Sequence, residues 1–227
     1  MSLSLASDIE ANLRRLEERI ARACARAGGS PQGITLVAVT KSVAPWAIEA
    51  AFQAGVRHFG ENRVQEARAK VEALSHLGLT WHMVGHLQTN KVKMALKLFA
   101  MIQSVDSVRL AQKLSQHAEG PVPVLLQVNV AGEVTKSGFR PEEVARAAEE
   151  IARLPKLKVE GLMTIAPWVS DPETVRPVFR RLRELRDALG LEHLSMGMTD
   201  DFEVAVEEGA TILRIGRALF GERLPHG

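Results

Sequence analysis

Runs of apolar, largely β-branched residues alternate with amphipathic stretches along the chain, and this alternation is the strongest constraint on its fold. A parallel sheet covered by helices needs strands that are apolar almost throughout. We expect eight strands, at residues 34–40, 58–62, 79–87, 101–105, 122–130, 159–166, 193–198 and 211–215, each followed by a helical stretch. Eight such units predict an α/β fold, a single-domain (β/α)8 TIM barrel spanning residues 1–227.

The alternative architecture is an open doubly wound sheet, which usually carries a glycine-rich turn after its first strand. Here that turn reads TKSVAPW and contains no glycine. The amphipathic stretch from Ser7 to Ala27 precedes the first strand, so we also expect an extra N-terminal helix. Its apolar stripe includes Cys24, the one cysteine, which we therefore predict to be a core thiol rather than a reactive one.

Composition narrows the class of protein. With 227 residues, 46% of them hydrophobic and 25% charged, the chain can bury one full core. It has no run near the roughly 18 to 20 apolar residues of a membrane span and no secretory signal pattern, so we expect a cytoplasmic protein that does not bind membranes. The charge of +2, without basic clusters between aromatic residues, argues against nucleic-acid binding. No exposed heptad or broad apolar stripe indicates a dimer, so we expect a monomer.

Lys41 closes the first expected strand and is unusual after a run as apolar as LVAV. A helix starting at Pro45 would occupy the outer side of that strand, so the lysine stem should point into the barrel mouth, where barrel enzymes place their active sites. Partial desolvation there favours the free amine, which can attack a carbonyl. The plainer interpretation is a solvated lysine at the end of a strand.

Two C-terminal segments, LSMGMTDDFEVA and ILRIGRALFG, have the features of a phosphate site. The first places Ser195 and Thr199 before a helix whose Asp200 and Glu203 have the spacing of a capping box. The second places Gly216 before another short helix, where the backbone can approach a ligand closely. Together they match the usual phosphate site after barrel strands seven and eight, although glycines can also simply end strands.

Arg214 lies two residues before Gly216 and is expected to face the barrel mouth, where a guanidinium needs an acceptor. A ligand nitrogen or carboxylate would serve, and an ion pair with a glutamate such as Glu61 is the structural alternative. An amine for an aldehyde, an arginine for a ring nitrogen and two loops for a phosphate together fit pyridoxal 5'-phosphate.

Seven motifs occur in order between Leu36 and Gly221: LVAVTK, HFGENRVQEA, WHMVGHLQTNK, KSGF, LMTIAP, LSMGMTDDFEVAVEEGAT and LRIGRALFG. Through them the sequence resembles the YggS/PROSC family of pyridoxal-phosphate-binding homeostasis proteins. The resemblance covers nearly the whole chain. It implies a barrel like the N-terminal domain of alanine racemase, the architecture of fold-type III pyridoxal-phosphate proteins.

The resemblance also implies roles for individual residues. Lys41 would form a Schiff base with the cofactor, and Arg214 would contact its pyridine nitrogen. The other implied contacts are Asn62 on the phenolic side and Ser195, Thr199, Gly216 and the Arg217 backbone around the phosphate. We add Met163, from the end of the sixth strand, to this cofactor-binding set and assign no residue to a metal.

The implied function is intracellular vitamin B6 homeostasis without substrate turnover, with apoenzymes as possible partners that receive the cofactor. An arginine opposite the pyridine nitrogen makes the ring a weaker electron sink. A racemase also needs a second acid–base group, which related barrels supply as a tyrosine, and this chain contains none. A pyridoxal-phosphate-dependent amino-acid racemase remains the alternative, as does a phosphosugar-binding barrel.

Two histidines, a lysine and an arginine-rich segment lie outside the implied cofactor site. His82 could replace the missing acid–base group, but it is more typical of a packed polar residue. Lys136 is expected to be solvated, with a minority interpretation in which it receives or releases the cofactor. His86 receives no role. The segment RRLRELRD is expected to form the solvated face of its helix.

Overall fold

The computed structural model describes the backbone of residues 2–221 and the side chains of residues 8–221. The strands are β1 (Thr35–Val39), β2 (His58–Glu61), β3 (Thr80–Met83), β4 (Met101–Val105), β5 (Val122–Gln127), β6 (Leu157–Met163), β7 (His193–Ser195) and β8 (Ile212–Ile215). The helices are α1 (Ser2–Arg26), α2 (Pro45–Gln53), α3 (Val64–Ala73), α4 (Val92–Leu98), α5 (Val108–His117), α6 (Val144–Ala152), α7 (Arg176–Ala188), α8 (Phe202–Glu207) and α9 (Arg217–Phe220). Short 3-10 turns occupy Pro31–Gly33, Ser75–Leu77, Thr89–Lys91 and Pro172–Val175.

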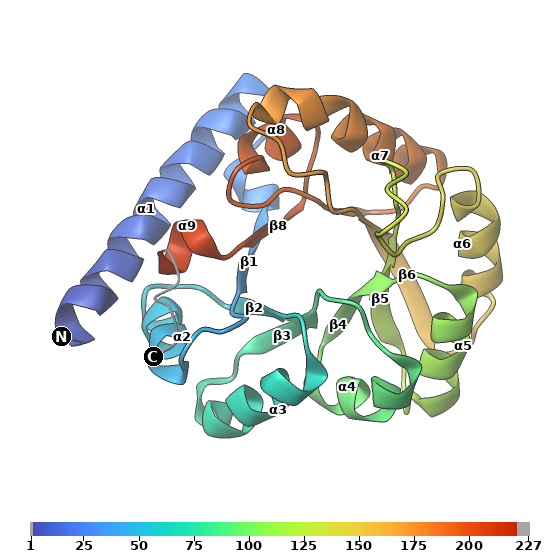
Figure 1. Ribbon diagram of the computed structural model, residues 1–227, viewed down its shortest axis with the longest axis horizontal. Helices are drawn as coiled ribbons and strands as arrows, with labels where there is room; N and C mark the ends of the chain where they lie inside the picture. The colour runs from blue at the N-terminus through green and yellow to red at the C-terminus, as the bar shows by residue number, and fades with distance from the viewer. Residues whose placement is uncertain (1, 222–227) are drawn as a thin grey trace.

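The eight strands form one closed parallel barrel in chain order, with the helices outside it (Figure 1). Strand β1 closes the ring because it pairs with β2 on one side and β8 on the other. Val37 is the register partner of both His58 and Arg214. The predicted (β/α)8 barrel is therefore confirmed, and the open doubly wound alternative is wrong.

Side chains alternate between the two faces of the barrel wall, as they must in a strand. Five buried residues form a cluster inside the barrel: Val37, Val84, Leu125, Met163 and Ile212. A much larger apolar cluster joins the outer face of the strands to the helices. The core therefore has an inner and an outer layer, separated by the sheet, and polar groups in either layer need partners within it.

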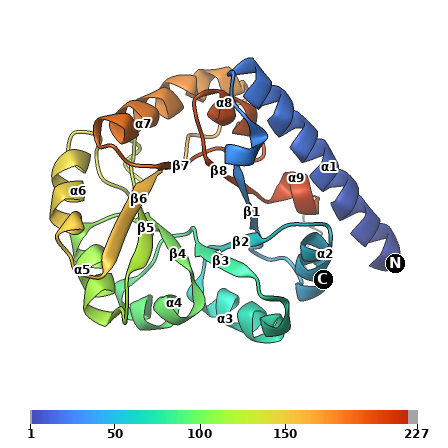
Figure 2. The same cartoon turned by 180° about the vertical axis from the view of Figure 1, so that it is seen from behind.

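Helix α1 is the expected extra N-terminal helix, although it begins at Ser2 rather than Ser7. It contacts α2, α8 and α9, so it covers the seam where the first and last units of the barrel meet (Figures 1 and 2). Cys24 on this helix is 3% exposed, and burial raises the pKa of its thiol, which confirms the prediction of a core thiol. No helix within residues 2–221 combines the length and the apolar character needed to span a bilayer.

Four strands end three or more residues earlier than the sequence predicts. Strand β3 ends at Met83 rather than residue 87, β5 at Gln127 rather than 130, β6 at Met163 rather than 166, and β7 at Ser195 rather than 198. Apolar residues beyond these ends, such as Leu87, Val128 and Met196, are buried in loops, and hydrophobicity alone cannot distinguish a buried loop from a buried strand. This shortening places more of the chain in loops at the carboxyl ends of the strands.

Candidate functional site

Lys41 lies in the loop between β1 and α2, two residues after the strand ends. Its side chain is in phase with Val37, which faces the inner cluster, so the strand directs it toward the barrel mouth. The residue is half-buried, and its Nζ forms no hydrogen bond or ion pair with any described residue. Lys41 is therefore an amine at the mouth whose charge no described carboxylate neutralises.

The backbone on both sides of Lys41 is held by side chains of α3. The Lys70 Nζ donates to the Thr40 carbonyl oxygen at 2.5 Å, and the Ser42 N–H donates to the Glu66 Oε1 at 2.6 Å. Ser42 has a φ of 61°, which a non-glycine residue adopts rarely and at a cost. The contacts from α3 thus hold a strained turn, and with it the starting point of the Lys41 side chain.

Lys70 is a buried cation with two carboxylate partners. Its Nζ lies 2.7 Å from Glu61 Oε1 and 2.7 Å from Glu66 Oε1, and its side chain is 8% exposed. Burial raises the pKa of Glu61, against the opposing hydrogen bonds from Lys70 and Thr40. Burial acts on Glu66 in the same direction, but its hydrogen bonds to Lys70 and to the Ser42 N–H outweigh that effect and lower its pKa. Sequence reasoning missed this cluster; its one signal was the four-residue spacing of Glu66 and Lys70 on a helix.

Arg214 on β8 is a buried cation of a different kind. It is 4% exposed, and it donates to the Ser195 Oγ at 2.6 Å and to the Thr164 carbonyl oxygen at 2.7 Å. Among the described residues it forms no ion pair. Burial lowers the pKa of Arg214 to about 10, against the opposing charge of Asp201, so the group stays charged at neutral pH. The alternative of an ion pair with Glu61 is wrong, because Glu61 binds Lys70 instead.

Two further predicted residues lie around Arg214. Met163 belongs to the inner cluster that also contains Ile212, two residues from Arg214 on β8. Ser195 is fully buried, and its hydroxyl donates to the Gln103 Oε1 at 2.6 Å while it accepts from Arg214. In this structure the Ser195 hydroxyl therefore points into the barrel, and its implied contact with a phosphate stays a prediction.

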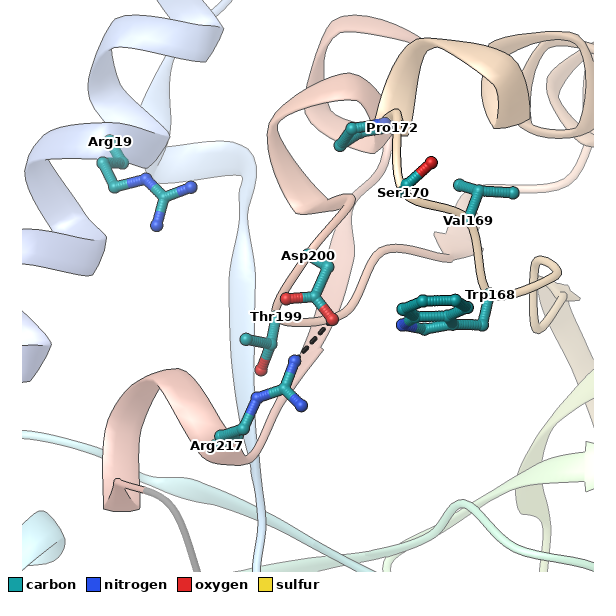
Figure 3. A pocket seen from close by; sticks show the side chains of 8 residues that line it. All are labelled: Arg19, Trp168, Val169, Ser170, Pro172, Thr199, Asp200 and Arg217. Carbon is teal, nitrogen blue, oxygen red and sulfur yellow. Dashed lines mark hydrogen bonds and ion pairs between the residues drawn. The ribbon is translucent and has the colours of Figure 1, made fainter.

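The loops after β7 and β8 meet, as the two C-terminal segments predict. The Ala218 N–H donates to the Thr199 Oγ1 at 3.2 Å, and Arg217 forms an ion pair with Asp200 at 2.5 Å (Figure 3). Gly216 lies at the junction of β8 and α9, where an added Cβ would come within 3.4 Å of the Val39 carbonyl oxygen. Thr199, Gly216 and Arg217 are thus brought together beside the end of β1.

The predicted capping box of Asp200 and Glu203 is wrong. Helix α8 begins at Phe202, and the Asp201 carboxylate accepts the Met198 N–H at 2.6 Å, while Glu203 accepts from Arg19. The neighbouring Gly197 has a φ of 94°, and a Cβ there would lie 2.6 Å from the Ala205 Cβ. The tight turn before α8 therefore depends on glycine rather than on a cap.

An open pocket of about 490 Å³ lies beside these loops (Figure 3). Thr199, Asp200 and Arg217 line it together with Arg19 from α1 and the exposed ring of Trp168. Lys41 and Arg214 do not line this pocket. It touches the predicted cofactor site only through Thr199 and Arg217, which follow β7 and β8.

Asn62 and the two histidines of WHMVGH have distinct surroundings. Asn62 follows β2 and is half-buried, and its backbone packs so closely on Gly85 that a Cβ there would lie 2.5 Å from the Asn62 oxygen. His82 is 4% exposed, and burial, with a smaller effect of His58, lowers its pKa to about 3. The prediction of a packed polar residue is confirmed. His86 is exposed and lies 2.7 Å from Asp106, outside the site.

The expectation of a solvated Lys136 is wrong. The Lys136 Nζ binds Glu133 at 2.6 Å and reaches the Ala166 carbonyl oxygen at 3.2 Å, so it ties the loop after β5 to the loop after β6.

The expected solvated face of α7 is confirmed, because the Arg180 and Arg181 side chains are each 52% exposed. This face also makes ion pairs: Arg180 and Arg183, with Arg176 from the start of α7, converge on Glu208, which is only 4% exposed. These arginines join α7 to the end of α8.

A model of the alanine racemase N-terminal domain family matches residues 11–224. The chain is 49% identical over 220 residues to the pyridoxal phosphate homeostasis protein of Aquifex aeolicus, and the match covers 93% of this chain and 96% of that protein. A protein from Bifidobacterium adolescentis of known structure is 40% identical, with a TM-score of 0.90 and 96% of each chain covered.

The PLP-bound structure of PipY from Synechococcus elongatus is 38% identical, with a TM-score of 0.79, and the match covers 89% of this chain and all of that one. These matches extend over nearly the full barrel, at identities well above those at which only a fold is shared. The chain therefore belongs to the family of pyridoxal phosphate homeostasis proteins, built on the fold of the alanine racemase N-terminal domain.

Proposed function

We propose that this protein binds pyridoxal 5'-phosphate as a Schiff base on Lys41 and serves in vitamin B6 homeostasis. The observation that carries the proposal is Arg214, a buried guanidinium whose hydrogen-bond partners are neutral oxygens only. A buried cation without a carboxylate is costly unless a ligand supplies an acceptor. The ring nitrogen of the cofactor is such an acceptor, and the relative PipY binds this cofactor.

The residues of the site fit the remaining groups of the cofactor. The Lys41 amine would bond to the aldehyde carbon with loss of one water, which is the reactive carbonyl chemistry that the cofactor supplies. Thr199, Gly216 and the Arg217 backbone would hold the phosphate where the loops after β7 and β8 meet. Asn62, Met163 and Ser195 complete the set of proposed contacts.

We propose that the protein holds the cofactor without turning over a substrate. A guanidinium donates to the ring nitrogen and does not protonate it, so the ring stays a weak electron sink. The acid–base group that a racemase needs opposite its lysine is not supplied by His82, which is packed inside the barrel with a strongly lowered pKa, or by a tyrosine, because the sequence has none. Apoenzymes are the proposed recipients, and we propose a monomer with one domain over residues 1–227.

Absorption spectroscopy tests the cofactor proposal. Wild-type protein incubated with pyridoxal phosphate should show an imine absorption band, and borohydride reduction should fix the label on Lys41, as located by peptide mass spectrometry. Lys41→Ala should lose the band, whereas Lys93→Ala, which alters an exposed lysine of α4, should keep it. A colourless wild type would refute the proposal.

Proton exchange distinguishes a carrier from a racemase. Cofactor-loaded protein should leave the Cα proton of L-alanine and L-serine unexchanged in deuterated water, apart from the slow exchange that free cofactor catalyses. Exchange at enzymatic rates that disappears in Lys41→Ala would favour the racemase. Displacement of pyridoxal phosphate by a sugar phosphate at equal concentration would favour the phosphosugar-binding alternative.

A further inference from the structure

A chain of side-chain hydrogen bonds crosses the interior of the barrel and ends on Arg214. It runs from Arg214 to the Ser195 Oγ at 2.6 Å and on to the Gln103 Oε1 at 2.6 Å. The Gln103 Nε2 lies 3.1 Å from the His82 Nδ1, and the His82 Nε2 lies 2.9 Å from the His58 Nδ1. We call these five side chains, from β8, β7, β4, β3 and β2, the interior relay.

The chemistry of the donors sets one direction for the interior relay. A guanidinium only donates, so Ser195 accepts from Arg214 and gives its own proton to the Gln103 oxygen. The Gln103 amide nitrogen then donates to the His82 Nδ1, which leaves the His82 proton on Nε2. His82 in turn donates to the His58 Nδ1. Both imidazoles are therefore neutral, with the proton on Nε2.

Burial agrees with this assignment. Gln103 and Ser195 are fully buried and His82 is 4% exposed, whereas His58 is half-buried at the start of β2. Desolvation lowers the pKa of both histidines, so both stay neutral near pH 7. His58, at the start of β2, is the outermost member of the interior relay.

Each donor in the interior relay lies on the Arg214 side of its bond and each hydrogen points away from Arg214, so the negative end of every donor–hydrogen dipole faces the guanidinium. Aligned hydrogen bonds polarise one another and stabilise the charge at the end of the chain. We propose that Gln103, His82 and His58 are positioning residues that hold the Ser195 oxygen toward Arg214, and so orient the charged guanidinium for the ring nitrogen of the cofactor. This inference rests on the proposed function.

The first test needs no cofactor. In the full chain labelled with nitrogen-15, long-range proton–nitrogen correlation spectra of the imidazoles distinguish the two neutral tautomers. His58 and His82 should both carry the proton on Nε2 at pH 7, with assignments from His58→Asn and His82→Asn. A proton on Nδ1 of His82, or a protonated imidazole at either position, would overturn the relay whether or not the protein binds pyridoxal phosphate.

The second test asks whether the interior relay acts on the cofactor. Gln103→Met breaks it next to Ser195 and should weaken pyridoxal phosphate binding about tenfold, which corresponds to about 1.4 kcal/mol. His58→Leu removes the last acceptor and should weaken binding about threefold and shift the absorption maximum of the bound cofactor. His58→Asn keeps an acceptor near the Nδ1 position and should restore both readouts.

Ser104→Ala is the matched control, because Ser104 is also buried on β4 but its Oγ has no hydrogen-bond partner among the described residues and takes no part in the interior relay. It should leave affinity and spectrum unchanged. If His58→Leu matches wild type in both readouts, or His58→Asn fails to restore them in a folded protein, the positioning role is wrong. Wild-type protein that binds no pyridoxal phosphate would instead refute the proposed function, which the tautomers do not test.

Discussion

Two buried cations occupy the two layers of the same barrel, and they are satisfied in opposite ways. Lys70, in the outer layer, binds Glu61 and Glu66 at 2.7 Å each. Arg214, in the inner layer, binds one hydroxyl and one carbonyl oxygen and forms no ion pair with a described residue. The outer charge is neutralised by carboxylates, whereas the inner charge has only neutral partners among the described residues.

The two cations have different kinds of partner because they have different roles in the structure. Lys70 and its carboxylates hold the backbone around Lys41, so their interactions must be complete before any ligand arrives. Arg214 is stabilised by the aligned dipoles of the interior relay, which leave its net charge intact. The comparison predicts that substitutions at Lys70 damage the fold, whereas substitutions at Arg214 damage ligand binding.

The largest expected loss of stability is that of Lys70→Met. Removing the ammonium leaves the fully buried Glu61 carboxylate without its cation, and breaking a buried pair from one side typically costs about 3–5 kcal/mol. The free energy of unfolding from urea denaturation measures the loss. Arg68→Met, which breaks the exposed pair with Glu72 on the same helix, should leave stability nearly unchanged.

The double variant Glu61→Gln with Lys70→Met should recover much of that loss, because it removes the stranded carboxylate. If Lys70→Met were as stable as Arg68→Met, the ion pairs of Lys70 with Glu61 and Glu66 would not stabilise the fold. The contrast drawn between Lys70 and Arg214 would then be wrong.

An intermediate effect is expected on acidification. Burial lowers the pKa of His82 from 6.5 to about 3 in the folded protein, so the unfolded chain binds a proton first as the pH falls. The stability is therefore complete above pH 6.5 and decreases toward pH 3, by about 2 kcal/mol at pH 5. Glu66, whose pKa is lowered from 4.5, stays ionised at pH 5. Acid therefore destabilises the folded chain through a histidine of the inner layer.

Urea denaturation at pH 7 and pH 5 measures this effect. His82→Asn should remove most of the difference between the two pH values, although His58 contributes a change of the same sign. An equal difference in wild type and His82→Asn would show that another group causes the acid sensitivity.

The smallest change in stability is expected for Arg214→Met. Removing Arg214 strands no buried carboxylate, and the desolvation cost of its charge disappears together with its hydrogen bonds to neutral oxygens. We expect the free energy of unfolding to change by about 1 kcal/mol or less, and the affinity for pyridoxal phosphate to fall at least tenfold. A loss of stability as large as that of Lys70→Met, with unchanged affinity, would reverse the comparison.

The sequence predicted the barrel because strand and helix periodicities are local. It also predicted that Lys41, Arg214 and the loops around Thr199 and Gly216 lie at the carboxyl ends of strands, since position along a unit fixes the end of the barrel to which a residue belongs. The predicted ends of β3, β5, β6 and β7 were wrong, because apolar residues buried in the following loops resemble the strands that precede them.

The partners of buried polar groups could not be predicted. Gln103 looks like an ordinary residue in MIQSV, and nothing local indicates that it joins Ser195 to His82 across the barrel. Lys70 and Lys136 look like solvated lysines, and only the packed structure shows the carboxylates and carbonyl oxygens that they reach. Such partners come from other strands and loops, so their pairing depends on how the barrel closes.

The sequence by itself determined the order of the β/α units, the end of the barrel at which the reactive residues gather, and the family. Tertiary structure alone decided which buried charges are neutralised by carboxylates and which have only neutral partners among the described residues. The physical reason is that hydrophobic patterning acts between near neighbours in the chain, whereas the compensation of a buried charge depends on atoms that only folding brings within hydrogen-bond distance.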